Sequence, residues 1–151
     1  GSGTGAESQH ILQIIAENPQ KFTYLGMLSQ KKLAREMQKH KVFVLPSYYE
    51  GLPLVIIEAL ACGCRVVCTE LPGLRSFLGA EILSSGAVEL IKLPRLKNSD
   101  EPFEEDLPKF EASLIGAINK QLTSTGEEFD HAYIRKFTWE ENFRRIASIF
   151  G

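Results

Sequence analysis

The sequence predicts an α/β fold with a Rossmann-like parallel sheet and flanking helices. Its short apolar runs alternate with helical patterns, which is typical of βαβ units. From Val42 onward, the expected strands are Val42–Pro46, Arg65–Cys68 and Ala87–Leu93. The first is continuously apolar, as expected for a strand buried on both faces. With 151 residues, 44% of them hydrophobic and 24% charged, the chain is long enough for one domain with its own core.

The N-terminal part predicts two helices and a short strand. Glu7–Asn18 carries one apolar stripe at helical spacing, and Pro19 stops it. Lys21–Leu25 has the pattern of a short strand that ends at Gly26. Ser29 is the expected N-cap of a second helix, which should run to about His40.

The middle of the chain predicts a loop and then a buried helix. Ser47–Gly51 is polar and follows the first apolar strand. A helix should start at Leu52 or Pro53, where proline suits the first turn, and reach Ala61. Gly63 is the expected C-cap. After the next strand, a turn at residues 71–73 should lead into a short helix through Leu78.

The C-terminal part predicts three further helices. Asn98–Asp106 is acidic and predicts a solvated loop. Phe110–Leu122 and Asp130–Lys136 have helical patterns, and Thr138 with Glu141 predicts the capping box of a last helix. The inner face of that last helix should hold Phe143, Ile146 and Phe150.

Charge and hydropathy exclude several classes of partner. The net charge is −2 and the basic residues form no run, which disfavours nucleic acid and anionic membranes. The longest apolar stretch, Leu52–Cys62, is too short to span a membrane. The first residues have no basic start and no apolar core, so they do not form a signal peptide.

Three cysteines, Cys62, Cys64 and Cys68, suggest reduced thiols and a cytoplasmic setting. Their C-x-C-x3-C spacing is not a usual zinc pattern, and no histidine is near them in the sequence. We therefore expect small buried core thiols and no metal site.

The sequence predicts a ligand site at the loop Ser47–Gly51. In open α/β sheets, ligands bind outside the carboxyl ends of the strands, and this loop lies at such an end. It leads into a helix whose first N–H groups and dipole favour an anion such as a diphosphate. Gly51 would let the backbone approach a ligand closely.

Two carboxylates flank this helix start. Glu50 lies in the loop and Glu58 lies inside the helix. Because carboxylates accept hydrogen bonds from vicinal hydroxyls, one on each side could hold a sugar and a ribose. Glu58 stands among apolar residues, where a charge is costly unless it is paired. The alternatives are a solvated loop acid for Glu50 and an ion pair with a base such as Arg65 for Glu58.

Glu50 and Glu58 form an E-x7-E motif within S-x-x-E-G-x-P-x4-E-A-x-A-C-G. This pattern resembles the signature of the retaining, GT-B-fold glycosyltransferases of family 4, the group 1 glycosyl transferases. Further segments resemble the family as well, and together they cover most of the chain. They are Tyr24-Leu25-Gly26, Arg65–Cys68 with Leu71-Pro72-Gly73, and Phe137-Thr138-Trp139.

The resemblance implies that residues 1–151 are part of a nucleotide-sugar-binding domain. Such a domain serves transfer, with retention, from a nucleotide diphosphate sugar to a hydroxyl of a glycan or lipid-linked acceptor. It implies that Glu50 contacts the donor sugar as the candidate catalytic residue and that Glu58 contacts the ribose. It also implies that the loop at Gly26–Leu28 borders the base, and that neither a metal nor another cofactor is needed. The implied substrate-binding residues are Glu50, Gly51, Leu52, Leu54, Val55, Glu58, Gly26 and Met27.

The chain also departs from the family pattern. Pro53 has no N–H, so one donor to the sugar or diphosphate is absent. The family's first strands, with their phosphate-binding arginine and lysine, and its acceptor domain would precede Gly1. We therefore expect the fragment to be inactive alone, and its unpaired strand edge to promote self-association.

Other functions are compatible with the sequence. One is a non-catalytic nucleotide-sugar-binding or scaffolding subunit, and another is a two-domain epimerase or phosphorylase. Gly1–Ala6 also fits the loose G-x-G-x-x-G/A pattern of dinucleotide binding, although no strand precedes it and no acidic strand end follows.

Overall fold

The computed structural model describes the chain except for residues 1–5, 126–128, 139, 142–147 and 149–151. The glycine-rich start and most of the expected last helix, including Trp139, Phe143, Ile146 and Phe150, lie outside the described residues. The described residues form two compact units, 1–33 and 34–151. No described helix combines the length and the hydropathy needed to cross a bilayer.

The first unit contains helix α1, Ala6–Glu17, as the sequence predicts. The expected strand Lys21–Leu25 is wrong. The amides of Lys21 and Phe22 donate to the carbonyl of Asn18 in a turn, and the rest of the segment has no regular secondary structure and joins no ladder within the described residues. Its large apolar side chains are exposed, including Tyr24 at 59%, so neither pairing nor burial holds this segment as a strand.

Helix α2, Gln30–Met37, leads into the second unit and ends three residues before the expected end at His40. Its inward residue Met37 is 5% exposed, as the spacing predicts.

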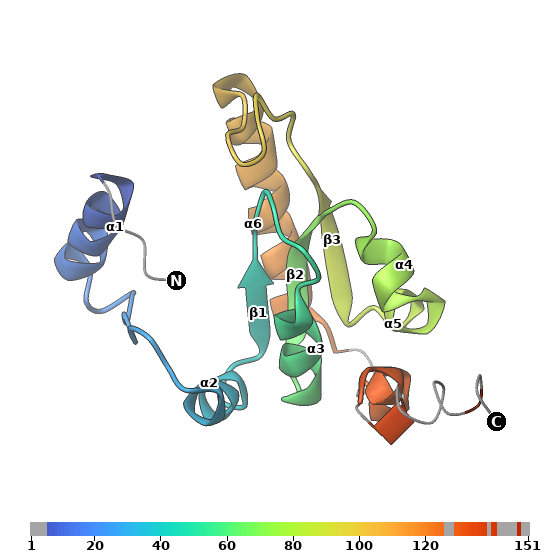
Figure 1. Ribbon diagram of the computed structural model, residues 1–151. Helices are drawn as coiled ribbons and strands as arrows, with labels where there is room; N and C mark the ends of the chain where they lie inside the picture. Colours follow the sequence, from blue (N-terminus) through green and yellow to red (C-terminus); the bar gives the residue numbers. More distant parts are fainter. Residues whose placement is uncertain (1–5, 126–128, 139, 142–147, 149–151) are drawn as a thin grey trace. The chain divides into compact units, whose positions relative to one another are not determined.

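The second unit is built on a three-stranded parallel sheet in the order β1-β2-β3. The strands are β1 Val42–Leu45, β2 Arg65–Glu70 and β3 Val88–Lys92. Figure 1 shows them side by side with helices on both faces. The α/β fold class and the parallel sheet are thus confirmed, as a Rossmann-like half of a GT-B fold, with three strands within the described residues.

Helix α6, Leu107–Thr123, covers one face of the sheet and contacts all three strands. Val67 of β2 packs there against Ile91, Phe110 and Ala117. Successive strand residues point to opposite faces, so Val66 and Cys68 of β2 point to the other face, where α3, Leu54–Ala61, packs. Figure 1 shows α3 in front of the sheet and α6 behind it.

The expectation that Val42–Leu45 is buried on both faces is wrong. All four residues are half-buried, whereas the four central residues of β2 are buried. The reason is position: β1 lies at an edge of the described sheet and β2 lies in the middle.

Helix α3 ends as the sequence predicts. Gly63 has φ +86°, and its N–H donates to the Leu60 carbonyl while that of Cys64 donates to Ala59. This pair of bonds is the Schellman motif, which requires a residue in the left-handed region.

The segment after β2 contains two short helices where the sequence predicted one. Helix α4, Leu74–Leu78, is confirmed, and α5, Ala80–Ser84, follows it directly. Gly79, with φ +84°, separates the two because a continuous helix does not admit a positive φ.

Helix α6 begins at Leu107, three residues before its predicted start, with a proline in its first turn. The acidic segment before it contains a short 3-10 turn and several ion pairs. Lys97 pairs with Glu101 at 3.0 Å, Arg95 pairs with Asp106 at 2.8 Å, and a 3-10 turn, η1, covers Glu104–Asp106. Most of its acidic side chains are exposed, which confirms the expected solvated loop, and neighbouring bases bind several of them.

The 3-10 segment η2, His131–Phe137, packs against α3 and confirms the predicted short helical piece, though not as an α-helix. Lys136 Nζ donates to the carbonyl of Leu78 at 2.8 Å, which ties η2 to the end of α4. Thr138 Oγ1 accepts from the N–H of Glu141 at 3.3 Å, which is half of the predicted capping box.

Candidate functional site

The loop at residues 47–51 starts directly after β1 and its proline, at the carboxyl end of the strand. Ser47 Oγ donates to Glu50 Oε1 at 3.1 Å, which holds the carboxylate over its own loop. Glu50 and Gly51 are both exposed. The loop therefore presents a carboxylate and an open backbone to solvent at the edge where ligands of parallel sheets bind.

The start of α3 offers fewer backbone N–H groups to a ligand than the sequence suggests. The N-cap is Pro53, which is buried, has no N–H and makes no side-chain cap. The N–H of Leu54 already donates to the carbonyl of Leu52 at 2.8 Å. Within the described residues, the amides of Gly51, Leu52 and Val55 donate to no protein acceptor. These three amides are the ones that a bound anion would meet.

The rim of the loop is apolar. Tyr49 is 70% exposed, Leu52 66% and Leu54 58%. Tyr48 is different: its ring lies 5.5 Å from that of Phe110 of α6, and burial and the Glu111 carboxylate raise its pKa. Tyr48 is therefore packed against the core, whereas Tyr49 is exposed at the rim.

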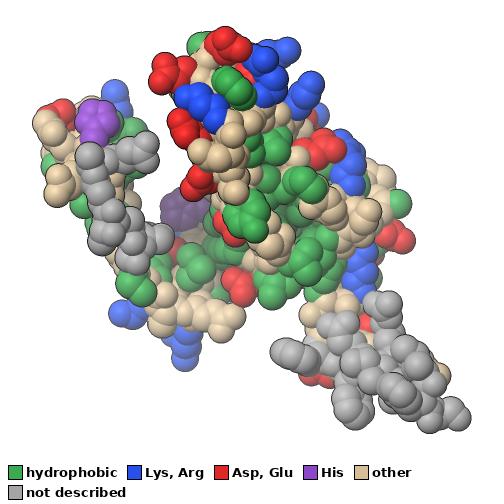
Figure 2. All heavy atoms as spheres, turned by 45° about the horizontal axis from the view of Figure 1, so that its top comes forward, with side chains coloured by type: hydrophobic (Ala, Val, Ile, Leu, Met, Phe, Trp, Pro, Cys, Tyr) green, Lys and Arg blue, Asp and Glu red, His purple; other side chains and the backbone are tan. Residues whose placement is uncertain are grey.

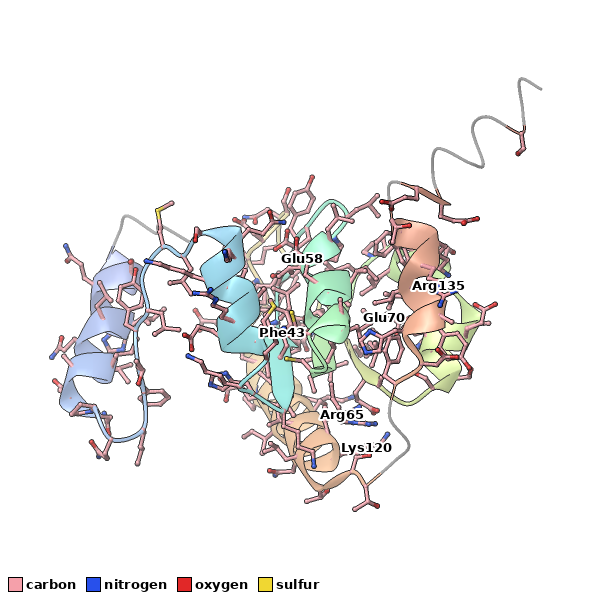
Figure 3. All side chains as sticks on the ribbon, turned by 90° about the horizontal axis from the view of Figure 1, so that it is seen from below. Phe43, Glu58, Arg65, Glu70, Lys120 and Arg135 are labelled. Atoms are coloured by element: carbon pink, nitrogen blue, oxygen red, sulfur yellow. The ribbon has the colours of Figure 1, made fainter. Side chains whose placement is uncertain are left out.

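Glu58 lies on α3, half-buried, between helix residues that are fully buried. It follows Leu54 by four residues, so it shares the helix face that carries the exposed Leu54 at the loop rim. The pKa of Cys62, one turn further on, is raised mainly by burial, and the nearby Glu58 carboxylate raises it further. Figure 3 shows Glu58 on α3.

The alternative partner of Glu58, Arg65, is bound elsewhere. Its Nε donates to Gln121 of α6, and its Nη2 donates to the carbonyl of Gly86 at 2.6 Å. Figure 3 shows Arg65 and Glu58 in separate parts of the view. Arg65 thus joins the amino end of β2 to α6, which is a structural role.

Gly26 and Met27 lie in the first unit, whereas Glu50 and Glu58 lie in the second. Gly26 has φ +63°, so its turn needs a residue that tolerates the left-handed region. Met27 is 85% exposed.

Two pockets that the sequence did not predict lie at the carboxyl ends of the other strands. One, of about 260 Å³, is formed after β2 by Leu71, Pro72 and Gly73 with the ion pair of Glu70 and Arg75. Arg75 Nη2 donates to Glu70 Oε2 at 2.8 Å, and this bond lowers the pKa of Glu70. The other, of about 300 Å³, lies where β3 ends. Both pockets could have been expected from the sequence, because the carboxyl ends of all strands in a parallel sheet lie at the same edge, where ligands bind.

Cys62 and Cys64 lie in the turn between α3 and β2, and Cys68 lies on β2. Cys64 Sγ donates to the Met37 carbonyl at 3.1 Å, and burial raises the pKa of Cys68 to about 12. Both are buried, which confirms them as core thiols, and Cys62 is half-buried. The described residues contain no group of three potential metal-binding side chains.

Comparison with known proteins gives a consistent result. Residues 1–90 match the family model described as glycosyl transferases group 1. An uncharacterized glycosyltransferase of Methanocaldococcus jannaschii is 27% identical over 137 residues, which are 91% of this chain and 35% of that protein.

Two further relatives match shorter parts. A probable sucrose-phosphate synthase of Thermosipho melanesiensis is 33% identical over 121 residues, 78% of this chain and 24% of that protein. A putative teichuronic acid biosynthesis glycosyltransferase of Bacillus subtilis is 55% identical over 38 residues, 25% of this chain and 10% of that protein. The matched part of this chain therefore spans between a tenth and about a third of the length of these relatives.

Proposed function

Because this chain belongs to the glycosyl transferases group 1 family, we propose that it is the donor-binding half of a glycosyltransferase. Its substrate would be a nucleotide diphosphate sugar, and the sugar would pass with retention to a hydroxyl of a glycan or lipid-linked acceptor. The observation that carries this proposal is the arrangement at the carboxyl end of β1. There Glu50, the amides that donate to no protein acceptor and Glu58 follow one another along a single loop and helix start.

The amides and the helix dipole supply the binding of phosphate. Gly51, Leu52 and Val55 carry the N–H groups that donate to no protein acceptor within the described residues. Together with the positive end of the α3 dipole they favour the negative charge that develops on a departing diphosphate. This electrostatic stabilisation supports transfer without a resident metal ion.

The two carboxylates supply the recognition of hydroxyls. Glu50 is exposed at the loop, where it would accept hydrogen bonds from the donor sugar close to the bond that breaks. Glu58 lies about one turn into α3, where it would accept from the vicinal hydroxyls of the ribose. Ser47 holds Glu50 in place through its hydroxyl.

The acceptor-binding part and the first strands of such a domain would come from outside these 151 residues, as would catalysis of the complete reaction. A non-catalytic nucleotide-sugar-binding subunit has the same donor site and differs only in lacking turnover.

The test is a calorimetric titration of UDP, GDP and ADP into the chain and into its Glu58→Ala variant. We expect one nucleotide to bind and its affinity to fall at least tenfold in the variant, which corresponds to about 1.4 kcal/mol. A matched control is Glu81→Ala, which removes an exposed carboxylate of α5 far along the chain from the loop. Failure of all three nucleotides to bind, or equal binding by wild type and Glu58→Ala, would refute the donor site.

A further inference from the structure

Pro53 forms a tight turn between the candidate donor loop and α3. Its φ of −76° and ψ of 77° are typical of the central residue of an inverse γ-turn. The hydrogen bond of such a turn is present as well, because the N–H of Leu54 donates to the carbonyl of Leu52 at 2.8 Å. Proline suits this place, since its ring fixes φ at about −65°.

The turn takes the place of the side-chain cap of α3. A helix leaves its first N–H groups without an intrahelical partner, and a polar side chain at the N-cap commonly satisfies one of them. Pro53 makes no side-chain cap, and the turn instead pairs the N–H of Leu54 with a backbone carbonyl. The carbonyl of Pro53 then accepts from the N–H of Ile56 at 3.0 Å, which continues the hydrogen bonds into the helix.

The turn therefore determines which amides are left for a ligand. Within the described part of the chain, the amides of Gly51 and Leu52 before the turn donate to no protein acceptor, and neither does that of Val55 after it. The amide of Leu54, which lies between them in the sequence, is bound to Leu52. Because the ring of Pro53 fixes φ, the peptide groups on either side have little freedom to rotate.

The turn is attached to the core at Pro53 alone among its three residues. Pro53 is buried, whereas the side chains of Leu52 and Leu54 are 66% and 58% exposed. Figure 2, in which the carboxyl ends of the strands are turned toward the reader, shows hydrophobic side chains exposed on this face. The packing of Pro53 thus holds a segment of backbone that is otherwise open to solvent.

We propose that Pro53 is a positioning residue of the donor site, which acts through the amides of Gly51 and Leu52. This role rests on the donor site proposed above. The turn keeps the free loop in the backbone conformation that leaves these two amides to the diphosphate. A site that already has its binding conformation loses less conformational entropy when the ligand binds, so the fixed turn increases the affinity.

A merely structural proline predicts a different result. If Pro53 served only to start α3, its replacement would lower the free energy of unfolding and leave the nucleotide affinity of the folded protein unchanged. If Pro53 positions the amides, the affinity of the folded protein falls. The N–H of Leu54 then also loses its hydrogen bond in the folded protein without nucleotide.

Two variants separate these roles. Pro53→Ala frees φ and provides no cap, whereas Pro53→Ser frees φ and supplies the side chain that is common at an N-cap. We therefore expect Pro53→Ser to unfold closer to wild type than Pro53→Ala does. Both should bind nucleotide about threefold or more weakly than wild type, because only a fraction of the free molecules has the binding conformation.

The test combines two measurements on the folded chain. Calorimetric titration with UDP, GDP and ADP gives the affinity of wild type and of both variants. Amide hydrogen exchange followed by NMR reports the N–H of Leu54. We expect slow exchange in wild type, faster exchange in both variants, and slow exchange again when the nucleotide is bound.

The matched control is Pro108→Ala, which also removes a proline from the first turn of a helix, in α6. Pro108 is exposed and lies outside the donor loop. This variant should keep the nucleotide affinity of wild type and the slow exchange of the Leu54 N–H. Thermal unfolding of each variant shows that it is folded at the temperature of the titration.

Three outcomes would overturn the positioning role. The first is equal nucleotide affinity of wild type and folded Pro53→Ser. The second is tighter binding by either variant, which would show that the turn withholds the Leu54 amide from the ligand. The third is fast exchange of the Leu54 N–H in free wild type, which needs no variant and would show that the turn does not hold this amide.

The two proposals fail in different ways. If wild type binds none of the three nucleotides, the donor site is refuted and the positioning role with it. If wild type binds a nucleotide in a manner that depends on Glu58, and Pro53→Ser binds it equally well, the donor site stands and only the positioning role is refuted.

Discussion

The ring of Tyr48 packs against the ring of Phe110 with their centroids 5.5 Å apart and their planes tilted by 57°. This contact joins the loop after β1 to the first turns of α6, on the face of the sheet where Val67 and Ile91 are buried. The candidate donor loop is therefore anchored to the core by its second residue, while its third, Tyr49, is 70% exposed.

Replacement of Tyr48 by alanine should destabilise the second unit. The ring is half-buried and packs on an aromatic partner, so we expect a loss of about 1–3 kcal/mol in the free energy of unfolding. Tyr49→Ala should stay within about 0.5 kcal/mol of wild type, because it removes an exposed ring. Urea unfolding followed by circular dichroism measures both, and equal effects of the two changes would contradict the anchoring role.

Gly63→Ala should also destabilise the chain. Gly63 has φ +86°, a left-handed conformation that costs an L-residue with a side chain about 1–2 kcal/mol. No heavy atom lies within 4 Å of the place of the new Cβ, so the cost comes from the backbone alone. Gly63→Asn, which tolerates this conformation better, should recover part of the loss in the same urea experiment.

The ion pair of Glu70 and Arg75 predicts a dependence on pH with a definite sign. The pKa of Glu70 is lowered in the folded chain, mainly by its hydrogen bond from Arg75, so the pair stabilises the fold above the ordinary pKa of glutamate. That stabilisation should be lost as the pH falls through the lowered pKa. In Arg75→Gln, an NMR titration should show the pKa of Glu70 returning toward its ordinary value, and an unchanged pKa would contradict the assignment.

The thiols should differ in reactivity. Cys68 is 1% exposed with a pKa raised to about 12 by burial, and Cys64 is 2% exposed. At pH 8 we expect a thiol reagent to label the half-buried Cys62 first, and to label the other two only after unfolding in urea, because the thiolate is the reactive form. Mass spectrometry of the labelled peptides identifies the order, and early labelling of Cys68 would contradict its burial.

The elements of the second unit were largely predictable because their signals are local. Alternation of apolar runs with helical patterns identified all three strands, and Gly63 identified the end of α3 through its backbone requirement. The strand expected at Lys21–Leu25 was wrong because a strand depends on a partner, and β-branched or aromatic composition does not reveal one. The burial of β1 was wrongly predicted for the same reason, since its place at an edge depends on strand order, which is a property of the tertiary structure.

The candidate site was predictable only in part. The loop and the two glutamates follow from motif and spacing, and the structure places both in one unit. The hydrogen bond from the Leu54 amide to Leu52 depends on exact backbone geometry. The pocket after β3 depends on contacts between segments that are distant in sequence. Charged residues near strand ends were visible in the sequence, but nothing local distinguished them from other surface lysines.

Gly51→Ala separates stability from binding. Gly51 does not have a positive φ, and no heavy atom lies within 4 Å of the place where its Cβ would be built. The variant should therefore unfold within about 0.5 kcal/mol of wild type. Because the proposed donor approaches the backbone at this residue, a methyl group there should weaken nucleotide binding at least tenfold. Gly63→Ala should do the opposite: it should destabilise the chain and leave the nucleotide affinity of the folded protein unchanged. Calorimetric titration of both variants under conditions where both are folded makes the comparison, and full nucleotide affinity in Gly51→Ala would show that the ligand does not approach this part of the loop.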